Sequence, residues 1–240
     1  MKLKDFLGES TGKSVANLKI DYKGGGFFCA NKRLTSLAGA PSHVDGDFYC
    51  SDNELTSLEG APSHVGGHFD CSNNELTSLE GAPSHVSGKF DCSVNKLTSL
   101  EGAPSHIGVG FYCSHNKLTS LAGAPSHVGA HFYCSHNELT SLEGAPSHVG
   151  GDFDCSINEL ASLKDVYKHI AEIKGKFYAF KNPINSHVLG LLLIKGVTEV
   201  RLDNGQVTEI LNRHLGGGRV GMLMAQEELI EAGLEEFAQL

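Results

Sequence analysis

Two residue types that are able to do chemistry recur at one fixed interval along this chain of 240 residues. Seven cysteines and seven histidines each repeat every 21 residues. The cysteines are Cys29, Cys50, Cys71, Cys92, Cys113, Cys134 and Cys155, and the histidines are His43, His64, His85, His106, His127, His148 and His169. Thiolates and imidazoles are common metal ligands and common nucleophiles and bases. The question is therefore whether these rows are reactive sites or a repeated scaffold.

The regular spacing favours a scaffold. A metal site needs ligands that converge from different directions, whereas one residue repeated in stacked units forms a parallel row. We therefore interpret the cysteines as small buried hydrophobic residues and predict no metal site. An odd number of cysteines at one repeat position also argues against a disulfide framework. We interpret the histidines as makers of repeated structural hydrogen bonds, and the alternative is a row that responds to pH.

We expect no catalysis. Serine and histidine recur in every copy, whereas an active site needs one asymmetric constellation. The Gly-Gly-Gly runs at Gly24 and Gly216 lack the strand and the Lys-Ser/Thr context of a phosphate-binding loop. The sequence therefore predicts no catalytic residues and no cofactor.

The repeated unit reads F-x-C-S-x-N-x-L-T-S-L-x-G-A-P-S-H-V-x-G-x and begins at Phe27. Side chains alternate along a strand, so Phe48 and Cys50 face the core and Tyr49 faces away. Stacked copies predict a parallel sheet with one strand per repeat, at a spacing of ~4.8 Å, and a shared core of Phe, Cys, Leu and Val. The asparagine that follows the strand, Asn74 for example, is expected to form a ladder that satisfies turning backbone.

A period of roughly 20 to 29 residues around L/C-x-x-N-x-L is the signature of leucine-rich repeats, which this chain resembles. Its A-P-S-H-V segment is similar to L-P-x-x-L in the short repeats of bacterial effectors, although their ubiquitin-ligase domain has no counterpart here. The short Cys-containing repeats also resemble leucine-rich repeat proteins encoded by large tailed bacteriophages. The resemblance implies a leucine-rich repeat solenoid of α/β type, with a mostly parallel sheet, an irregular convex side and a helical C-terminal cap.

We predict three segments. Residues 1–26 form an N-terminal cap, and residues 27–184 form the array of seven copies and a degenerate eighth, "GKFYAFKNPI". Residues 185–240 show no repeat and read as a mostly helical C-terminal cap. The apolar side of the last helix is expected to comprise Leu223, Leu229, Ile230, Leu234 and Phe237.

Charge and hydropathy limit the kinds of partner. The formal net charge is −9, so no general positive field attracts nucleic acid or an anionic membrane. The longest apolar run, residues 188–194, is far shorter than the roughly 20 residues of a membrane-spanning helix, and no secretory signal is evident. We expect a soluble intracellular protein with a protein partner. The phage resemblance implies the cytoplasm of an infected bacterial cell, or packaging in the virion.

The copies differ mainly at places predicted to face away from the core: before Phe, between Phe and Cys, and two residues after Cys. The predicted partner-binding residues are Asp47, Tyr49, His68, Asp70, Lys89, Asp91, Tyr112, His115, His131, Tyr133, His136, Asp152 and Asp154. Tyrosine is favoured at interfaces because it joins a large apolar face to one polar tip. We therefore predict that the concave sheet binds a protein. Freely drifting solvated positions, and a metal held by a histidine pair beside tyrosine, are the alternatives.

The start of the chain, "MKLKDFLGES", places Leu3, Phe6 and Leu7 on one side of a helix. It resembles the capsid-targeting peptides of large tailed phages, which are cut after L-x-E. That resemblance implies processing between Glu9 and Ser10. A simple N-terminal cap is the alternative.

Three functions follow as hypotheses. The first is a non-enzymatic protein-binding module, for which the phage resemblance implies inhibition of a host defence protein. The second is an acidic nucleic-acid mimic that occupies a basic nuclease or regulator. The third is a structural or packaged virion component.

Overall fold

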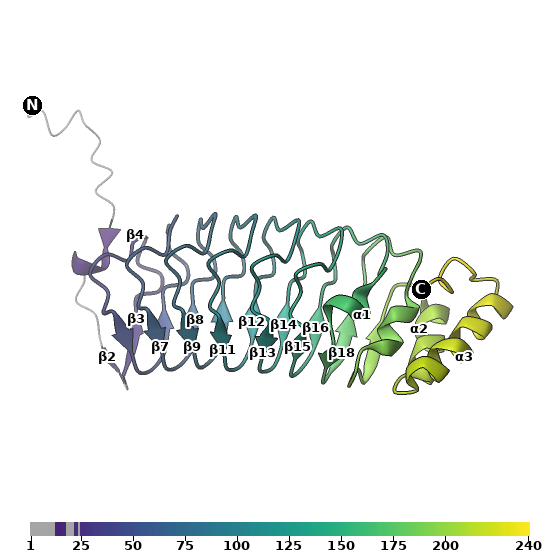
Figure 1. The fold of residues 1–240 in the computed structure, drawn as a ribbon. Helices are drawn as coiled ribbons and strands as arrows, with labels where there is room; N and C mark the ends of the chain where they lie inside the picture. The colour runs from purple at the N-terminus through teal and green to yellow at the C-terminus, as the bar shows by residue number, and fades with distance from the viewer. Residues whose placement is uncertain (1–12, 18–21, 24) are drawn as a thin grey trace, which may run out of the picture.

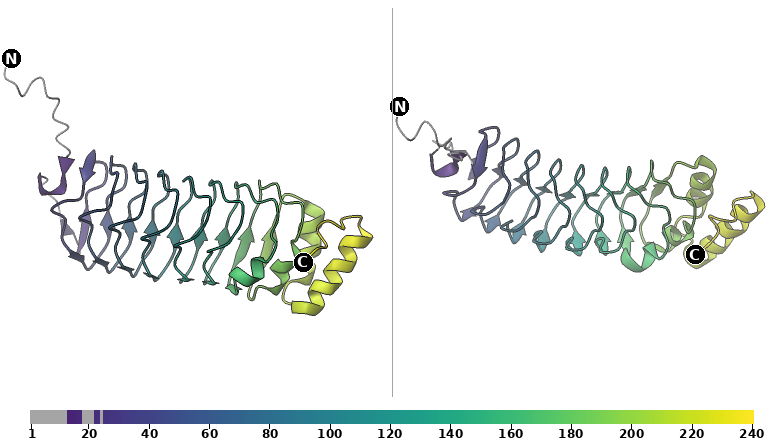
Figure 2. Two further views of the ribbon diagram at one scale, coloured as in Figure 1. Left: turned by 45° about the horizontal axis from the view of Figure 1, so that its top comes forward. Right: turned by 90° about the horizontal axis from the view of Figure 1, so that it is seen from above.

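The computed structural model describes residues 13–17, 22–23 and 25–240. Within them the chain winds into a parallel β-solenoid of about nine turns, followed by a short helical region at its C-terminal end (Figures 1 and 2). The predicted amphipathic start with Leu3, Phe6 and Leu7 lies outside the described residues, as does the predicted cleavage between Glu9 and Ser10.

The larger sheet has ten strands, of which all but the first pair are parallel. In chain order they are β2 (Tyr22–Lys23), β3 (Gly26–Phe28), β6 (Phe48–Tyr49), β8 (Phe69–Asp70), β10 (Phe90–Asp91), β12 (Phe111–Tyr112), β14 (Phe132–Tyr133), β16 (Phe153–Asp154), β18 (Lys176–Tyr178) and β19 (Glu199–Arg201). Phe90 pairs with Phe69 on one side and with Phe111 on the other, so equivalent residues of successive repeats lie side by side. The predicted parallel sheet with 21-residue repeats is confirmed.

A second parallel sheet of seven strands runs along the return segments. Its strands are β5 (His43–Val44), β7 (His64–Val65), β9 (His85–Val86), β11 (His106–Ile107), β13 (His127–Val128), β15 (His148–Val149) and β17 (Glu172–Ile173). The prediction of one strand per repeat, with an irregular return, is therefore wrong. The return segment hydrogen-bonds to its neighbour, as when Gly66 N–H donates to the carbonyl of Val44 at 2.8 Å. A two-residue strand is too short for its alternation to stand out in the sequence.

The N-terminal end carries a small two-stranded sheet. It pairs β1 (Lys13–Ser14) with β4 (Leu34–Ser36), and the 3₁₀ turn η2 (Val15–Asn17) follows β1. Val15 is buried, so this segment covers the first turn of the core.

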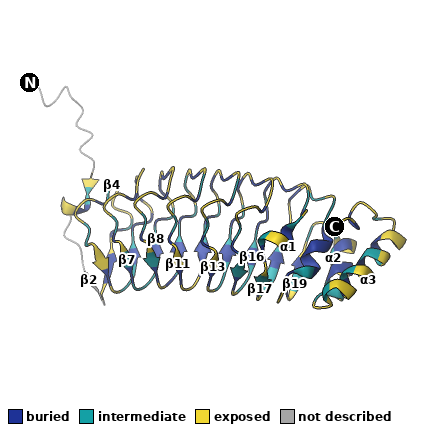
Figure 3. Ribbon diagram, in the orientation of Figure 1, coloured by how far each residue is buried: buried dark blue, intermediate teal, exposed yellow. Residues whose placement is uncertain are grey.

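The core is a continuous stack of repeated side chains. Figure 3 shows buried segments recurring from turn to turn along the array. Neighbouring core phenylalanines lie nearly parallel, with ring centroids 5.1 to 5.6 Å apart. The seven cysteines are buried free thiols beside them, and Leu55, Leu58 and Val65 are fully buried as predicted. Gly60, with φ at 86°, takes the left-handed conformation that favours glycine, and a Cβ there would lie 3.0 Å from the backbone of Leu37.

The asparagine ladder is confirmed. Asn74 Oδ1 accepts the N–H of Leu55 at 3.0 Å, and its Nδ2 donates to the carbonyls of Cys50 and Cys71, both at 3.1 Å. The same pattern is made by Asn53, Asn95, Asn116, Asn137, Asn158 and Asn182. Each asparagine therefore binds its own turn to the preceding one.

The C-terminal region contains α1 (Val166–His169), the 3₁₀ helix η3 (Leu189–Leu193), α2 (Gly205–His214) and α3 (Gly218–Glu231). Although the repeat is no longer visible in the sequence, β19 extends the larger sheet here. Asn212 of α2 closes this last strand, because its Oδ1 accepts from Val200 N–H at 2.7 Å and its Nδ2 donates to the Val200 carbonyl at 2.9 Å. Paired in this way, the last strand offers fewer free groups to another sheet. Among the described residues there is no helix with the length and hydropathy needed to cross a membrane.

The predicted apolar side of the last helix is only partly correct. Leu229 and Phe237 are buried, and Leu234 packs against the core. Leu223 and Ile230, however, are 58% and 49% exposed. The inward face of α3 combines the buried Gly221, Ala225 and Leu229 with the partly buried Met222.

Candidate interaction surface

The outward side chains of the ten-stranded sheet form one in-register row, which we call the strand face. Along it the structure aligns Phe28, Tyr49, Asp70, Asp91, Tyr112, Tyr133, Asp154, Tyr178 and Arg201. The phenylalanines that precede most of them are buried, whereas Tyr112 and Tyr133 are half-buried. The predicted outward orientation of this row is therefore observed. The array is gently curved (Figure 2).

The aspartates of the strand face also form hydrogen bonds within their own turns. Asp70, Asp91 and Asp154 each accept, through Oδ1, the N–H of the serine two residues later at 2.9 to 3.0 Å. Asp70 Oδ1 additionally accepts from the hydroxyl of Ser72 at 2.6 Å. This is the turn that aspartate side chains commonly form with nearby backbone. The predicted acidic patch thus has a structural role that sequence analysis missed.

Residues before the core phenylalanine join successive turns. A side chain at this place accepts the backbone N–H of the equivalent residue in the next turn, at 2.7 to 3.1 Å. The acceptors are Asp47 Oδ1, His68 Nδ1, His131 Nδ1 and Asp152 Oδ1. Because Nδ1 accepts in both histidines, their neutral rings carry the proton on Nε2. These four predicted partner-binding residues therefore have backbone partners of their own.

Four residues in the middle of the array gather into what we call the tyrosine cluster: Lys89, Tyr112, His131 and Tyr133. The rings of Tyr112 and Tyr133 meet edge to face, with centroids 5.1 Å apart and planes at 81°. Lys89 Nζ lies 5.2 Å from the Tyr112 centroid, and the His131 ring lies 5.5 Å from that of Tyr133. Gly110 leaves room for this arrangement, since a Cβ there would lie 2.9 Å from the Tyr112 ring. The structure thus assembles the cluster from three consecutive copies.

The electrostatics fix the charge states of the two tyrosines and of Lys89 near neutral pH. Burial, and then the charge of the Asp152 carboxylate, together raise the pKa of Tyr133 to about 12; Asp154 contributes in the same direction. Burial alone would lower the pKa of Lys89, but Asp91, whose Oδ2 lies 3.1 Å from Nζ, raises it overall. Near neutral pH the cluster therefore offers neutral phenol hydroxyls beside a lysine already paired with a carboxylate.

His115 and His136 form a separate pair on the turn after the strands. Their rings stack with centroids 3.9 Å apart, and both residues have a φ near +55°. Burial, the neighbouring His115 and then Lys181 lower the pKa of His136. In the described part of the chain, no hydrogen bond or ring contact joins this pair to the tyrosine cluster, and no three His, Cys, Asp or Glu side chains are grouped to hold a metal ion.

Sequence analysis placed too few aromatic residues on the strand face. Phe28 meets Tyr49 edge to face at 5.3 Å near the N-terminal end, and Tyr49 also donates to Asp47 Oδ2 at 3.2 Å. Tyr178 lies 5.8 Å from the Arg201 guanidinium at the other end. Tyr178 could have been found, because in "KFYAF" it occupies the place between Phe and Cys. Arg201 could not, since β19 carries no repeat signature.

The opposite sheet carries the histidine row, and the predicted repeated hydrogen bonds are largely wrong. His43, His64, His85 and His106 instead stack face to face, with centroids 4.8, 4.6 and 4.3 Å apart. Nδ1 bonds to the preceding serine hydroxyl are made by His127 and His148, at 3.0 and 2.9 Å. His169 is not in the row: it ends α1, and Glu172 takes the register position beside His148.

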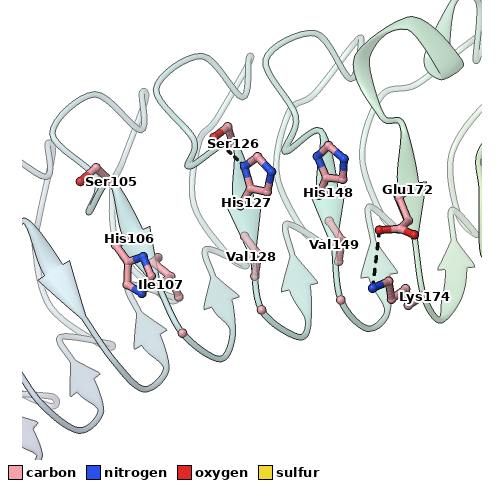
Figure 4. Close-up of a pocket in the computed structure, with 13 residues that line it drawn as sticks. Ser105, His106, Ile107, Ser126, His127, Val128, His148, Val149, Glu172 and Lys174 are labelled. Atoms are coloured by element: carbon pink, nitrogen blue, oxygen red, sulfur yellow. Dashed lines mark hydrogen bonds and ion pairs between the residues drawn. The ribbon is translucent and has the colours of Figure 1, made fainter.

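The histidine stack is interrupted once. The rings of His106 and His127 do not stack, and Ile107–Val128 is the one residue pair of the ladder between the described strands β11 and β13. A groove of about 560 Å³ runs along this part of the sheet (Figure 4). Figure 4 shows the His106 ring turned away from the direction taken by His127 and His148.

Comparison of the sequence with protein-family models and with curated proteins finds no match in either.

Proposed function

We propose that this protein is a non-enzymatic protein-binding module that engages its partner through the strand face. The observation that carries the proposal is the tyrosine cluster. The buried positions of the repeat hardly change between copies, whereas the cluster uses the variable positions of three copies to build one non-repeating surface. Tyrosine pairs supply large contact area at a low entropy cost, which is why they are enriched in interfaces.

The dimensions of the strand face fit this use. Nine parallel strands at about 4.8 Å spacing extend over roughly 40 Å. A standard interface takes up about 800 Å² per partner, so one protein domain would cover the cluster and its flanks. Because Lys89 is already paired with Asp91 and the chain has a net charge of −9, we expect a neutral or basic partner surface.

We also propose that the array is of the leucine-rich repeat class. The L-x-x-N-x-L pattern and the asparagine ladder support that assignment. If the resemblance to phage-encoded repeats extends to biology, the partner is a host defence protein, and the protein acts in the cytoplasm of the infected cell or is packaged in the virion. The sequence resemblance is the support for this finer proposal.

The acidic nucleic-acid mimic is the weaker alternative. Asp70, Asp91 and Asp154 each have one oxygen tied to their own turn, and tyrosines interrupt the acidic row. A mimic predicts partner binding that collapses with salt and with Asp70→Lys. The tyrosine-cluster proposal predicts binding that depends mainly on Tyr112 and Tyr133.

The experiment is affinity capture from bacterial lysate with three matched proteins. They are the wild type, Tyr112→Ala with Tyr133→Ala, and Thr119→Ala with Thr140→Ala, a control that alters exposed threonines in the same two repeats. We expect a protein retained by the wild type and by the threonine control but lost with the tyrosine variant. Equal recovery of every protein by all three would overturn the proposal.

A further inference from the structure

The terminal helix α3 presents most of its larger apolar side chains to solvent. Val220, Leu223, Met224 and Ile230 are 68%, 58%, 52% and 49% exposed. Their spacing of three, four and then six to seven residues places them on one side of the helix. We call these four residues the outer stripe.

The inward side of α3 combines two small residues with two larger ones. Gly221, Ala225 and Leu229 are buried, and Met222 is partly buried against the core. A Cβ on Gly221 would lie 2.6 Å from the carbonyl oxygen of His214, so the glycine lets the start of α3 approach the end of α2 closely. Of the larger apolar side chains of α3, therefore, Met222 and Leu229 face the chain's own core, whereas the others face solvent.

The orientation of α3 is fixed by specific contacts. Glu228 accepts from the Arg213 guanidinium at 2.6 Å, and its other carboxylate oxygen lies 3.0 Å from His214 Nε2. Leu229 is fully buried one residue further on. The outer stripe is therefore part of a well-packed helix.

The position of α3 makes the stripe more unusual. The helix lies beyond the last turn of the solenoid, at the end of the array (Figure 1). Terminal caps of repeat proteins normally show a polar outer face, because that face keeps the array from associating end to end.

We propose that the outer stripe binds the same stripe of a second copy of this chain, with the two α3 helices antiparallel around a two-fold axis. The charges at the two ends of α3 support a second copy as the partner. Arg219, at the beginning of α3, is the last basic residue of the chain, whereas Glu227 and Glu231 are exposed towards its end. Antiparallel pairing brings each Arg219 beside the acidic end of the other helix, and two-fold symmetry makes this contact twice.

The same arrangement matches the apolar residues. Val220 and Ile230 lie at opposite ends of the stripe, so an antiparallel pair sets each against the other, with Leu223 and Met224 near the middle. Glu227 lies on the same side of the helix between Met224 and Ile230, and it interrupts the apolar contact beside Leu223 of the other copy. Parallel pairing would instead place the acidic ends together. The dimer joins two solenoids through their C-terminal ends and leaves both strand faces free, so it presents two equivalent binding surfaces to a multivalent partner.

The test is sedimentation velocity over a range of about 1 to 200 µM protein, which covers Kd values on the order of 10 µM. We expect the wild type to shift from monomer to dimer across this range. Leu223→Glu, at an exposed position, should raise the Kd of dimerisation about tenfold. A circular dichroism spectrum like that of the wild type would show that the fold is kept.

A charge exchange identifies the partner as a second copy. Arg219→Glu and Glu231→Arg should each weaken self-association, because each creates like-charge contacts. Mixing the two variants should restore dimers, since both contacts in the mixed dimer then join opposite charges. A wild type that stays monomeric over the whole range, or dimers that neither Leu223→Glu nor the charge variants affect, would overturn the proposal.

Discussion

Asn116 Oδ1 accepts the N–H of Leu97 at 3.0 Å, across the boundary between two consecutive copies. Its Nδ2 donates to the carbonyls of Cys92 and Cys113, both at 3.1 Å. One side chain thus satisfies backbone groups in both turns at the place where the chain leaves the strand. Buried backbone groups are costly to leave unpaired, which explains why every full copy after the first carries this asparagine.

Asn116→Ala should therefore lower the free energy of unfolding by about 2 to 4 kcal/mol, because one N–H and two carbonyls lose their buried partner together. Urea unfolding followed by circular dichroism measures this loss. Thr119→Ala, on an exposed side chain of the same copy, should stay within about 0.5 kcal/mol of the wild type. Equal effects of the two substitutions would show that the ladder does not stabilise the array.

The turn after each strand predicts a stabilising substitution. The residue two places after Cys has a positive φ, and Asn, Asp or His occupies it in most copies. Val94 adopts φ 56° there although it is β-branched, and it is 46% exposed. The left-handed conformation costs such a residue roughly 1 to 2 kcal/mol more than it costs Asn.

Val94→Asn should raise the free energy of unfolding by about 1 kcal/mol, because Asn tolerates this conformation. The matched reverse change is Asn31→Val, at the equivalent exposed position with φ 55°, which should lower it by a similar amount. Both are read from urea denaturation curves. Shifts in the same direction would contradict the strain argument.

The cysteine row predicts low reactivity. Burial raises the pKa of every thiol in the row; for Cys29 it reaches about 12 despite the nearby Lys32, which lowers it. The thiolate is the reactive form, so native protein at pH 8 should resist alkylation by iodoacetamide. Mass spectrometry should find no adducts on the folded chain and seven on the chain in urea. Rapid native labelling at several cysteines would mean that the core is not closed.

The histidine stack predicts a loss of stability in acid. Burial, then the charges of His106 and His64, lower the pKa of His85. As the pH falls below about 6.5, this residue takes up a proton in the unfolded chain before it does so in the folded one. Protonation therefore favours unfolding in that range, and above it the effect vanishes.

Melting temperatures measured between pH 8 and 5 should fall less steeply for His85→Gln than for the wild type. The difference between the two proteins removes the contribution of carboxylates, which both share. In the double variant His64→Gln with His106→Gln, the pKa of His85 followed by NMR should rise. An unchanged pKa would show that the stacked neighbours do not affect it.

Much of the array could be predicted because one packing solution repeats. Phe69, Cys71 and Leu76 recur at a fixed period, and their alternation with Asp70 gives the direction of each side chain. The same regularity identified Asn74 as the residue that closes the turn. The second sheet was missed because a two-residue strand such as His85–Val86 has no alternation of its own, and its pairing depends on backbone contacts between copies.

The burial of α3 and the hydrogen bonds of the strand face could not be predicted from the sequence pattern. The spacing of Leu223 and Ile230 suggested a buried stripe, but both are exposed, whereas Gly221, where a Cβ would lie 2.6 Å from the His214 carbonyl oxygen, is buried. Which side of α3 is buried depends on the shape of the neighbouring elements. The variable positions were correctly expected to face outward. Some of them accept a hydrogen bond from the backbone of the next turn, as His68 does from Lys89. The sequence pattern does not reveal which ones, because such bonds depend on exact distances between the turns.

The most direct test of the strand face as the binding surface is site-specific photo-crosslinking to the protein captured by the wild type. A benzophenone amino acid replaces Tyr112 in one protein and Thr119 in another; the two positions belong to the same copy, but Thr119 is an exposed residue outside β12 and outside the strand face. We predict a covalent complex from position 112 and little or none from position 119. Crosslinking from position 119 with none from position 112 would contradict the account.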